Sequence, residues 1–254
     1  MSKVIGIDIG GTKIYGIVFN NGKVVKSKFV PTPNNLESFK EQILEIILDL
    51  SNGDKITSVG IGIAGGVDPV SGVITRSPNI PFINNFNTVK FLKSRGFKKV
   101  AVDNDANCFT RAELLVGQGK KLSNFLGITL GTGIGGGIVI NKNIYRGKDH
   151  NGAEFGHMYL EQDFFEKEFQ VLRDSKDFVK AGELIGKALA SLINVFSPEA
   201  IVIGGGYGIN ETAGYLASAK NEITKYIFNK KNKTKILISK IKNSGAIGAA
   251  LLVK

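Results

Sequence analysis

Short apolar runs separated by turn residues open the chain. Residues 4–8 predict a buried strand, residues 14–19 a returning strand, and residues 23–30 a third strand of the same antiparallel meander. Apolar side chains then recur at helical spacing over residues 36–50, which predicts a helix with one buried face that stops near Gly53. The chain therefore begins with three strands and a helix.

A similar succession returns later in the chain. A strand, a glycine-rich turn and a second strand come first, and a long helix follows them. The further elements predicted along the chain are strands over 59–63, 99–102, 125–130, 138–140 and 200–203, and helices over 106–116, 178–196 and 246–253. This repetition predicts an α/β fold of two related halves hinged around a cleft.

Three glycine-rich turns each follow a short apolar strand. Their sequences are DIGGTK at 8–13, GTGIGGG at 131–137 and GGGYG at 204–208. Because glycine lacks a β-carbon, its amide can approach an anion closely, as a phosphate-binding turn requires. A tight hairpin is the better explanation of any one turn alone, but three turns, two with a threonine hydroxyl beside the glycines, favour a nucleotide site.

Neither common phosphate motif accounts for these turns. The chain contains no GxxxxGK[ST] sequence, and the dinucleotide fingerprint requires a helix where residues 14–19 predict a strand. Asp8 ends the first strand, and its carboxylate could hold waters of Mg²⁺, which prefers oxygen ligands. The alternative is an aspartate that only caps the turn.

Composition narrows the class of protein. The chain has 254 residues, of which 43% are hydrophobic, enough for one large domain or two modest ones. Residues 1–8 lack the features of a secretory signal and no apolar run is long, so we expect a soluble cytoplasmic protein with no membrane partner. The only cysteine, Cys108, can form neither an intramolecular disulfide nor a thiolate cluster, so structural zinc is not expected.

The net charge of +11 favours polyanionic partners in general. The excess is mostly lysine spread over predicted helix faces, with a denser stretch over residues 225–242. No aromatic platform or zinc finger accompanies these lysines. We therefore expect a solvated basic surface and no specific nucleic-acid site.

Seven segments together resemble the ROK sugar kinases, a family of the actin, hexokinase and Hsp70 superfamily. They are DIGGTK (8–13), GIAGGVDPVSGVI (62–74), DNDANC (103–108), GTGIGGGI (131–138), GAEFGH (152–157), IVIGGG (201–206) and GAIGAA (245–250). The resemblance implies a two-lobed, actin-like (ribonuclease H-like) α/β fold of duplicated βββαβα units. It implies a smaller lobe of residues 1–108 and 243–254, a larger lobe of residues 109–242, and a homodimer.

The resemblance also implies an ATP-dependent hexose kinase that uses Mg²⁺. Its default acceptor is the 6-hydroxyl of glucose. Asp105 is the implied general base, which takes the proton of the attacking hydroxyl. The implied sugar ligands are Asn104, Glu154, His157, Gly65 and Asn79, whose polar groups suit the hydroxyls of a pyranose. The implied nucleotide ligands are Asp8, Gly10, Gly11, Thr12, Lys13, Gly131, Thr132, Gly133, Gly135, Gly205 and Gly206.

Several of these residues have a plainer interpretation. Asp103 and Asp105 precede a predicted helix and could be its N-terminal caps. Within the resemblance we expect Asp105 to be the base and Asp103 to be structural. His157 alone would be a structural histidine, but its spacing from Glu154 in a matching segment makes it a ligand. His150 receives no role.

The chain departs from the family after His157. Many members carry a CxCGxxGCxE zinc segment there, whereas residues 158–170 contain no cysteine. The glutamate that ends the family segment binds sugar, and spacing cannot choose among Glu161, Glu166 and Glu168. Ala153 also stands where the family usually has glycine.

Other functions stay open at this level. The donor could be polyphosphate, as in short glucokinases and glucomannokinases without the zinc segment, and the basic charge fits that reading. The sugar could be mannose, fructose, allose, N-acetylmannosamine or N-acetylglucosamine. A sugar-responsive regulator would need a DNA-binding module, for which the strand beginning at Val4 leaves no room. A binding protein that has lost catalysis is disfavoured by the intact Asp105.

Overall fold

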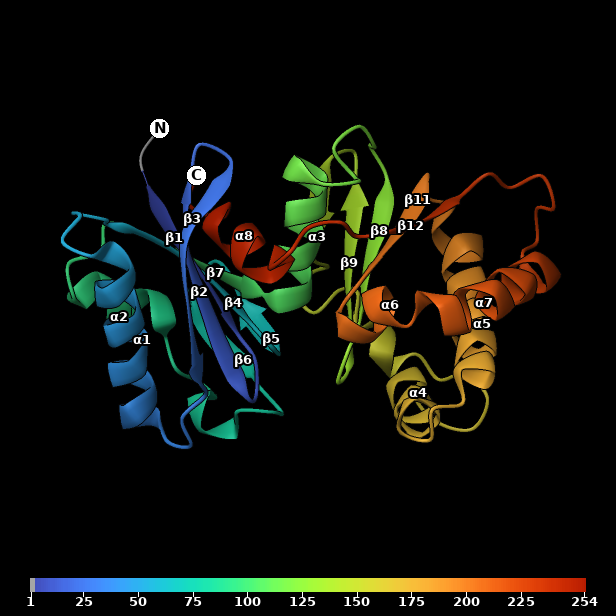
Figure 1. The fold of residues 1–254 in the computed structure, drawn as a ribbon, viewed down its shortest axis with the longest axis horizontal. Coiled ribbons are helices and arrows are strands. Elements are labelled where there is room, and N and C mark those ends of the chain that lie inside the picture. The colour runs from blue at the N-terminus through green and yellow to red at the C-terminus, as the bar shows by residue number, and fades with distance from the viewer. Residues whose placement is uncertain (1–2) are drawn as a thin grey trace. The chain divides into compact units, whose positions relative to one another are not determined.

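The computed structural model describes residues 3–254, which form two compact units (Figure 1). The first unit comprises residues 3–112, 146–151 and 241–254, and the second comprises residues 113–145 and 152–240. Each unit contains one five-stranded sheet. The lobe boundaries implied by the sequence stay a prediction.

The sheet of the first unit has the order β3-β2-β1-β4-β7. Neighbours β1, β2 and β3 pair antiparallel, whereas β4 and β7 continue the sheet in parallel with β1. A small two-stranded sheet of β5 and β6 follows β4. The strands are β1 (Val4–Ile9), β2 (Lys13–Asn20), β3 (Lys23–Pro31), β4 (Ser58–Ile63), β5 (Gly66–Asp68), β6 (Val73–Arg76) and β7 (Lys99–Asn104), and the helices are α1 (Leu36–Ser51), α2 (Thr88–Ser94), the start of α3 (Asp105–Val116) and α8 (Ser244–Ala250).

The sheet of the second unit repeats this plan in the order β10-β9-β8-β11-β12. Three antiparallel neighbours are again extended by two parallel strands. The strands are β8 (Phe125–Leu130), β9 (Ile134–Ile140), β10 (Asn143–Tyr145), β11 (Ala200–Gly204) and β12 (Lys235–Ile238), and the helices are α4 (Phe165–Asp174), α5 (Phe178–Phe196), α6 (Gly206–Asn210) and α7 (Thr212–Tyr226). The predicted α/β fold with a duplicated strand plan is confirmed.

Local sequence explains why the main elements form. Helix α1 starts at Asn35, whose side chain accepts a hydrogen bond from the Ser38 amide, and it ends at Asn52 in the left-handed conformation. Its buried side chains follow helical spacing, namely Phe39, Ile43, Ile46, Ile47 and Leu50. Strands β1, β4 and β8 are buried on both faces, as their continuous apolar runs predicted.

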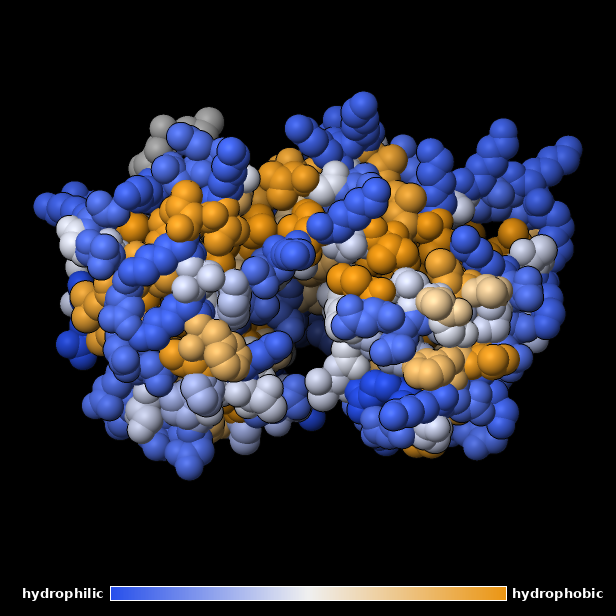
Figure 2. Space-filling view, in the orientation of Figure 1, coloured by the Kyte–Doolittle hydropathy of each residue, from blue (hydrophilic) through white to orange (hydrophobic). Residues whose placement is uncertain are grey.

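No helix formed by residues 3–254 combines the length and apolar character needed to cross a lipid bilayer. The face drawn in Figure 2 has both hydrophilic and apolar areas, and hydrophilic side chains gather over the loop that follows α7. The lysines of that stretch, among them Lys230, Lys231 and Lys233, are exposed to solvent.

Helix α8 packs on the first sheet through glycines. A β-carbon on Gly6 would overlap the carbonyl of Ala246, and one on Gly60 would overlap that of Ala249. On the helix itself, a β-carbon on Gly248 would overlap the carbonyl of Cys108 in α3. The last helix therefore fits between β1, β4 and α3 only because these positions lack side chains.

We predict that Gly60→Ala lowers the stability of the protein by several kcal/mol, because the added methyl group must displace backbone atoms of α8. Gly10→Ala is the matched control, since a β-carbon there would meet only the Lys13 carbonyl at an ordinary 3.5 Å. Thermal and urea unfolding of both variants measure the effect. Equal midpoints for Gly60→Ala and the wild type would contradict this account of the packing.

Candidate active site

The first glycine turn, residues 10–12, joins β1 to β2 in the first unit. The Gly10 amide donates to the Lys13 carbonyl at 2.9 Å. Thr32 anchors the turn from the other side, because its hydroxyl donates to the Gly10 carbonyl at 2.7 Å and its amide to the Thr12 carbonyl at 3.1 Å. Gly11, Thr12 and Lys13 are themselves exposed to solvent, as a ligand-binding turn requires.

The predicted sugar ligand Asn79 lies against this same turn. A β-carbon on Gly11 would be 2.8 Å from Cβ of Asn79. The side chain of Asn79 is exposed. The structure therefore places Asn79 beside the first glycine turn, and its role in binding sugar stays a prediction.

Asp8 and Asp105 lie close together in the first unit. Parallel pairing sets Asp8 opposite Gly62 and Gly62 opposite Asp103, so the ends of β1, β4 and β7 fall in one row. Gly62 leaves room for the start of α3, where a β-carbon would be 3.6 Å from Cα of Asp105. Burial, together with the charge of Asp105, raises the pKa of Asp8 to about 7, although Lys13 opposes the rise.

Asn104 is the cap of helix α3. Its side-chain oxygen accepts hydrogen bonds from the amides of Ala106 at 2.8 Å and Asn107 at 3.1 Å. Its side-chain nitrogen donates to the Gly65 carbonyl at 2.9 Å. The capping role that the sequence offered to Asp103 or Asp105 thus belongs to the residue between them. The Asp105 carboxylate accepts from the Ala106 amide at 2.9 Å.

Gly65 holds a backbone conformation that favours glycine, with φ of 130°. A β-carbon there would also overlap the Arg76 carbonyl. The Asn104 side chain is anchored to this residue, so the two predicted sugar ligands form one rigid unit.

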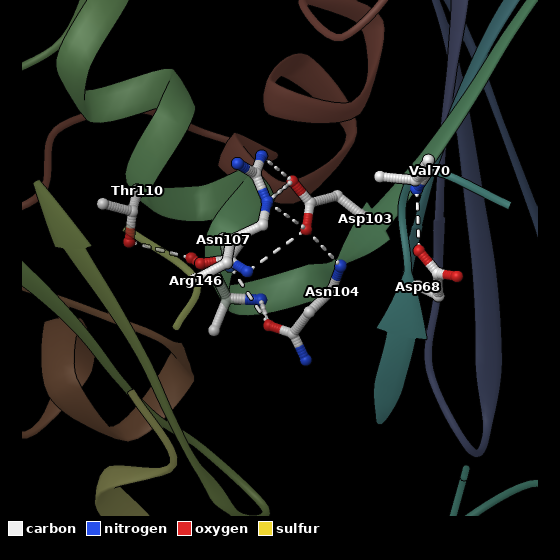
Figure 3. Close-up of polar contacts among 8 residues, drawn as sticks. Asp68, Val70, Asp103, Asn104, Asn107, Thr110 and Arg146 are labelled. Atoms are coloured by element: carbon white, nitrogen blue, oxygen red, sulfur yellow. Dashed lines mark hydrogen bonds and ion pairs between the residues drawn. The ribbon is translucent and has the colours of Figure 1, made fainter. Parts of the chain in front are cut away.

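Asp103 is buried and paired with Arg146 (Figure 3). The guanidinium approaches Oδ2 with Nη2 at 2.5 Å and Nε at 3.2 Å. The other carboxylate oxygen accepts from the Asn104 amide at 2.9 Å and from Nδ2 of Asn107 at 3.1 Å. Asp103 therefore has structural contacts, and Arg146, which sequence reasoning missed, neutralises its charge. Only the fold, which returns residues 146–151 to the first unit, reveals this pair.

The second glycine turn, residues 131–133, joins β8 to β9 in the second unit. The Gly131 amide donates to the Gly133 carbonyl at 2.9 Å. Thr132 at the tip is exposed. Gly135 lies beyond the turn, in β9, where it pairs with Thr129. The predicted nucleotide residues of this segment thus divide between a turn and a strand.

The third glycine turn follows β11. Gly205 has φ of 80°, and a β-carbon there would overlap the carbonyl of Leu130, the last residue of β8. Gly206 begins α6 beside open space. Tyr207 behind it stacks on Tyr215 with a centroid separation of 5.5 Å. Within the second unit, Gly205 therefore lies directly beside the strand that leads into Gly131.

Glu154 directly precedes a short 3₁₀ helix (Phe155–His157), and His157 is the last residue of that helix. Nδ1 of His157 is 3.6 Å from Oε2 of Glu154, and both side chains are exposed to solvent. Partial burial raises the pKa of Glu154, His157 opposes the rise, and the charge of Glu166 adds to it. The structure therefore places these three side chains near one another.

The contacts of the three candidate glutamates differ. Glu168 accepts hydrogen bonds from the amides of residues 161–163, each at 3.1 Å, and Glu161 pairs with Lys187. Glu166 accepts from the Ile134 amide at 2.6 Å, and a β-carbon on Gly156 would be 3.3 Å from its Oε2. Among the three, Glu166 faces the segment of Glu154 and His157.

Sequence and structure comparisons point to one family. The ROK family model matches residues 4–171 and 166–254. The chain is 28% identical to a glucokinase of Thermotoga maritima, over 99% of this chain and 97% of that protein. It is 37% identical to a beta-glucoside kinase of Listeria innocua over 63% of this chain, a match that covers only about half (54%) of that relative.

A solved structure extends the likeness to the whole fold. The crystal structure of a ROK family glucokinase from Streptomyces griseus, in complex with glucose and AMPPNP, superposes with a TM-score of 0.85 at 25% identity and covers 99% of each chain. The family model, the full-length relative and the shared fold agree. This chain therefore belongs to the ROK family, as a glucokinase-like sugar kinase.

Proposed function

We propose that this kinase transfers the γ-phosphoryl group of ATP to the 6-hydroxyl of a hexose, with glucose as the first candidate and Asp105 as general base. The observation that carries the proposal is the pair of carboxylates, Asp8 and Asp105, beside the first glycine turn. The glucokinase of known structure that binds glucose and AMPPNP supports the same donor and acceptor.

Asp105 is well placed to accept a proton. It is the first residue of α3, at the end of the helix where the helix dipole favours a negative charge. Asn104 caps the same helix and is tied to Gly65, so the position of the base is fixed before substrate arrives. A positioned base contributes about 10²- to 10⁴-fold to the rate, and alignment of the reactants contributes the rest.

The residues present fit Mg²⁺ held through water. Two neighbouring carboxylates with a raised pKa at Asp8 form a site with excess negative charge, which a hard cation relieves. Within residues 3–254, no group of three or more histidine, cysteine or acidic side chains is arranged to bind a metal directly. Asp8 would hold the waters of the ion. When bound, Mg²⁺ neutralises charge on the donor phosphates.

We propose Glu166 as the glutamate that joins Glu154 and His157 in binding sugar; Asn104, in the first unit, stays a predicted sugar ligand. Glu166 is the candidate whose charge acts on Glu154 and whose carboxylate lies at Gly156. Carboxylate, amide and imidazole groups together can accept hydrogen bonds from the hydroxyls of a sugar ring and donate hydrogen bonds to them.

Two further expectations stay predictions from the sequence: that the glycine turns of both units bind one ATP, and that the protein is a homodimer.

The activity is tested by a coupled assay over glucose, mannose, fructose, allose and N-acetylated hexosamines, with ATP or polyphosphate as donor. We predict ATP-dependent phosphorylation of a hexose by the wild type. Asp105→Asn, which keeps the bond to the Ala106 amide, lowers kcat at least 100-fold and leaves ATP binding intact. A variant that retains more than a tenth of the wild-type kcat would show that Asp105 is not the base.

Glu166→Gln raises the KM for sugar about tenfold or more, because an amide replaces a charged acceptor of sugar hydroxyls. The amide oxygen can still accept from Ile134, so the fold is retained. Glu168→Gln and Glu161→Gln are matched controls on the same segment and leave this KM unchanged. Equal effects of the three substitutions would remove the preference for Glu166.

Asp8→Asn should change stability in a direction that depends on pH. With a native pKa of about 7 against an ordinary value of 3.8, Asp8 binds its proton more tightly in the folded state. The wild type therefore loses stability as pH rises from about 4 to 7, by at most roughly 4 kcal/mol. The neutral variant avoids this loss and unfolds at higher temperature than the wild type at pH 8.

Thermal unfolding at pH 5 and pH 8 without Mg²⁺ measures the effect. We expect the increase in melting temperature of Asp8→Asn over the wild type to be smaller at pH 5. Asp68→Asn is a control of opposite sign, since hydrogen bonds from the Ser71 hydroxyl and the Val70 amide lower the pKa of Asp68. That carboxylate stabilises the fold once ionised. Its loss therefore lowers the melting temperature at pH 8. A gain for Asp8→Asn that is equal at both pH values would refute the assigned pKa.

A further inference from the structure

Helix α4 presents one face to the second glycine turn. Glu166, Gln170 and Arg173 are spaced by four and three residues, which puts them on the same side of a helix. All three contact the turn or the residue after it. The first six residues of this helix, 165–170, belong to the segment 158–170 that departs from the family, and Arg173 lies just after that segment.

The contacts from Gln170 and Arg173 go to carbonyl groups of the turn. Nη1 of Arg173 donates to the Gly131 carbonyl at 2.9 Å and to the Thr132 carbonyl at 2.6 Å. Nε2 of Gln170 donates to the same Thr132 carbonyl at 3.1 Å. The Arg173 side chain is 23% exposed, its guanidinium pairs with Asp174 at 2.8 Å, and it lies over the Phe169 ring at 6.0 Å. The positive charge is therefore held in a fixed place beneath the turn.

Because peptide groups are planar, the orientation of these carbonyls also fixes the direction of the neighbouring amides. In a trans peptide the C=O and N–H groups point in opposite directions. Holding the carbonyls of Gly131 and Thr132 toward α4 therefore turns the N–H groups of Thr132 and Gly133 away from α4. Within residues 3–254, neither amide donates a hydrogen bond to the protein. A cation at the carbonyl oxygens also polarises these amides and makes them stronger donors.

We propose that Arg173 and Gln170 are positioning residues for the donor phosphates: they hold the carbonyls of the second glycine turn so that the Thr132 and Gly133 amides face the phosphate chain. This inference rests on the proposed use of a nucleotide donor. Backbone N–H groups bind phosphate strongly only when they are already aimed at it.

The first glycine turn supports this reading by comparison. There the Gly10 and Thr12 carbonyls are held by the hydroxyl and amide of Thr32, which directly follows strand β3. Strand β10, the counterpart of β3, ends at Tyr145, which pairs with Ile138 far from the turn. The second turn thus receives its donors from the side chains of α4.

The test compares Arg173→Ala and Gln170→Ala with Lys167→Ala, a control on an exposed part of the same helix that pairs with Asp163. Hydrogen bonds from a charged group change an equilibrium by roughly ten- to a hundredfold. We expect Arg173→Ala to raise the KM for ATP by that factor, Gln170→Ala to raise it less, and Arg173→Lys to recover part of the loss. The KM for sugar stays within about twofold of the wild type, as does every constant of Lys167→Ala.

Calorimetry with AMPPNP separates this inference from the proposed reaction, because binding needs no turnover. If the wild type binds AMPPNP and Arg173→Ala binds it at least tenfold more weakly, the inference stands even if no sugar is phosphorylated. Unchanged AMPPNP affinity in both Arg173→Ala and Gln170→Ala overturns it. So does a wild type that binds no nucleotide, or a parallel rise in the KM for sugar. If Arg173→Ala fails to fold, Arg173→Lys and Gln170→Ala decide by the same readouts.

Discussion

The register of three parallel strands is the constraint on which the chemistry of the first unit depends. Pairing of β1 with β4 and of β4 with β7 sets Asp8, Gly62 and Asp103 in one row, so the residues just beyond the strands meet at one edge. A shift of one residue would turn Asp8 to the opposite face of the sheet. The glycines that seat α8 on β1 and β4 help to fix this register, because the helix fits only where they stand. The placement of Asp8 and Asp105 therefore follows from packing elsewhere in the first unit.

Charge at this edge is distributed unequally. Asp8, Asp103 and Asp105 lie at neighbouring strand ends, where Arg146 pairs with the buried Asp103 and Lys13 acts to lower the pKa of Asp8. The ion pair serves the fold, since the same carboxylate also holds the Asn104 amide and the Asn107 side chain. Asp8 and Asp105 keep their mutual repulsion, which raises the pKa of Asp8. Carboxylates that repel each other in an empty site are suited to binding a cation and a phosphate. Such unfavourable electrostatics are common at functional sites.

Sequence patterns predicted the strands and long helices because large apolar side chains mark them. Helix α5 was predicted over its full length, whereas α7, which packs on it, was not recognised. The reason lies in the contact itself: β-carbons on Gly182 and Gly186 of α5 would overlap carbonyls of Tyr215 and Ala219, so the two helices meet through small residues. Such an interface leaves little apolar periodicity in the sequence of α7.

The candidate site could be predicted from its sequence motifs. The cap at Asn104, the partner Arg146 and the orientation of Glu166 could not, because they depend on contacts that motif spacing does not encode.

The two glycine turns show why their supports are hard to recognise in a sequence. A turn that binds phosphate through its amides must keep its glycines, because side chains would block the approach. Its carbonyls need only some donor behind them, and the identity of that donor is free. One turn uses the hydroxyl and amide of Thr32, and the other uses the guanidinium of Arg173 with the amide of Gln170. Under the proposed use of a phosphate donor, the glycine motif marks where phosphate binds, whereas the residues that hold its carbonyls differ between the turns: Thr32 follows a strand, and Arg173 and Gln170 lie on a helix.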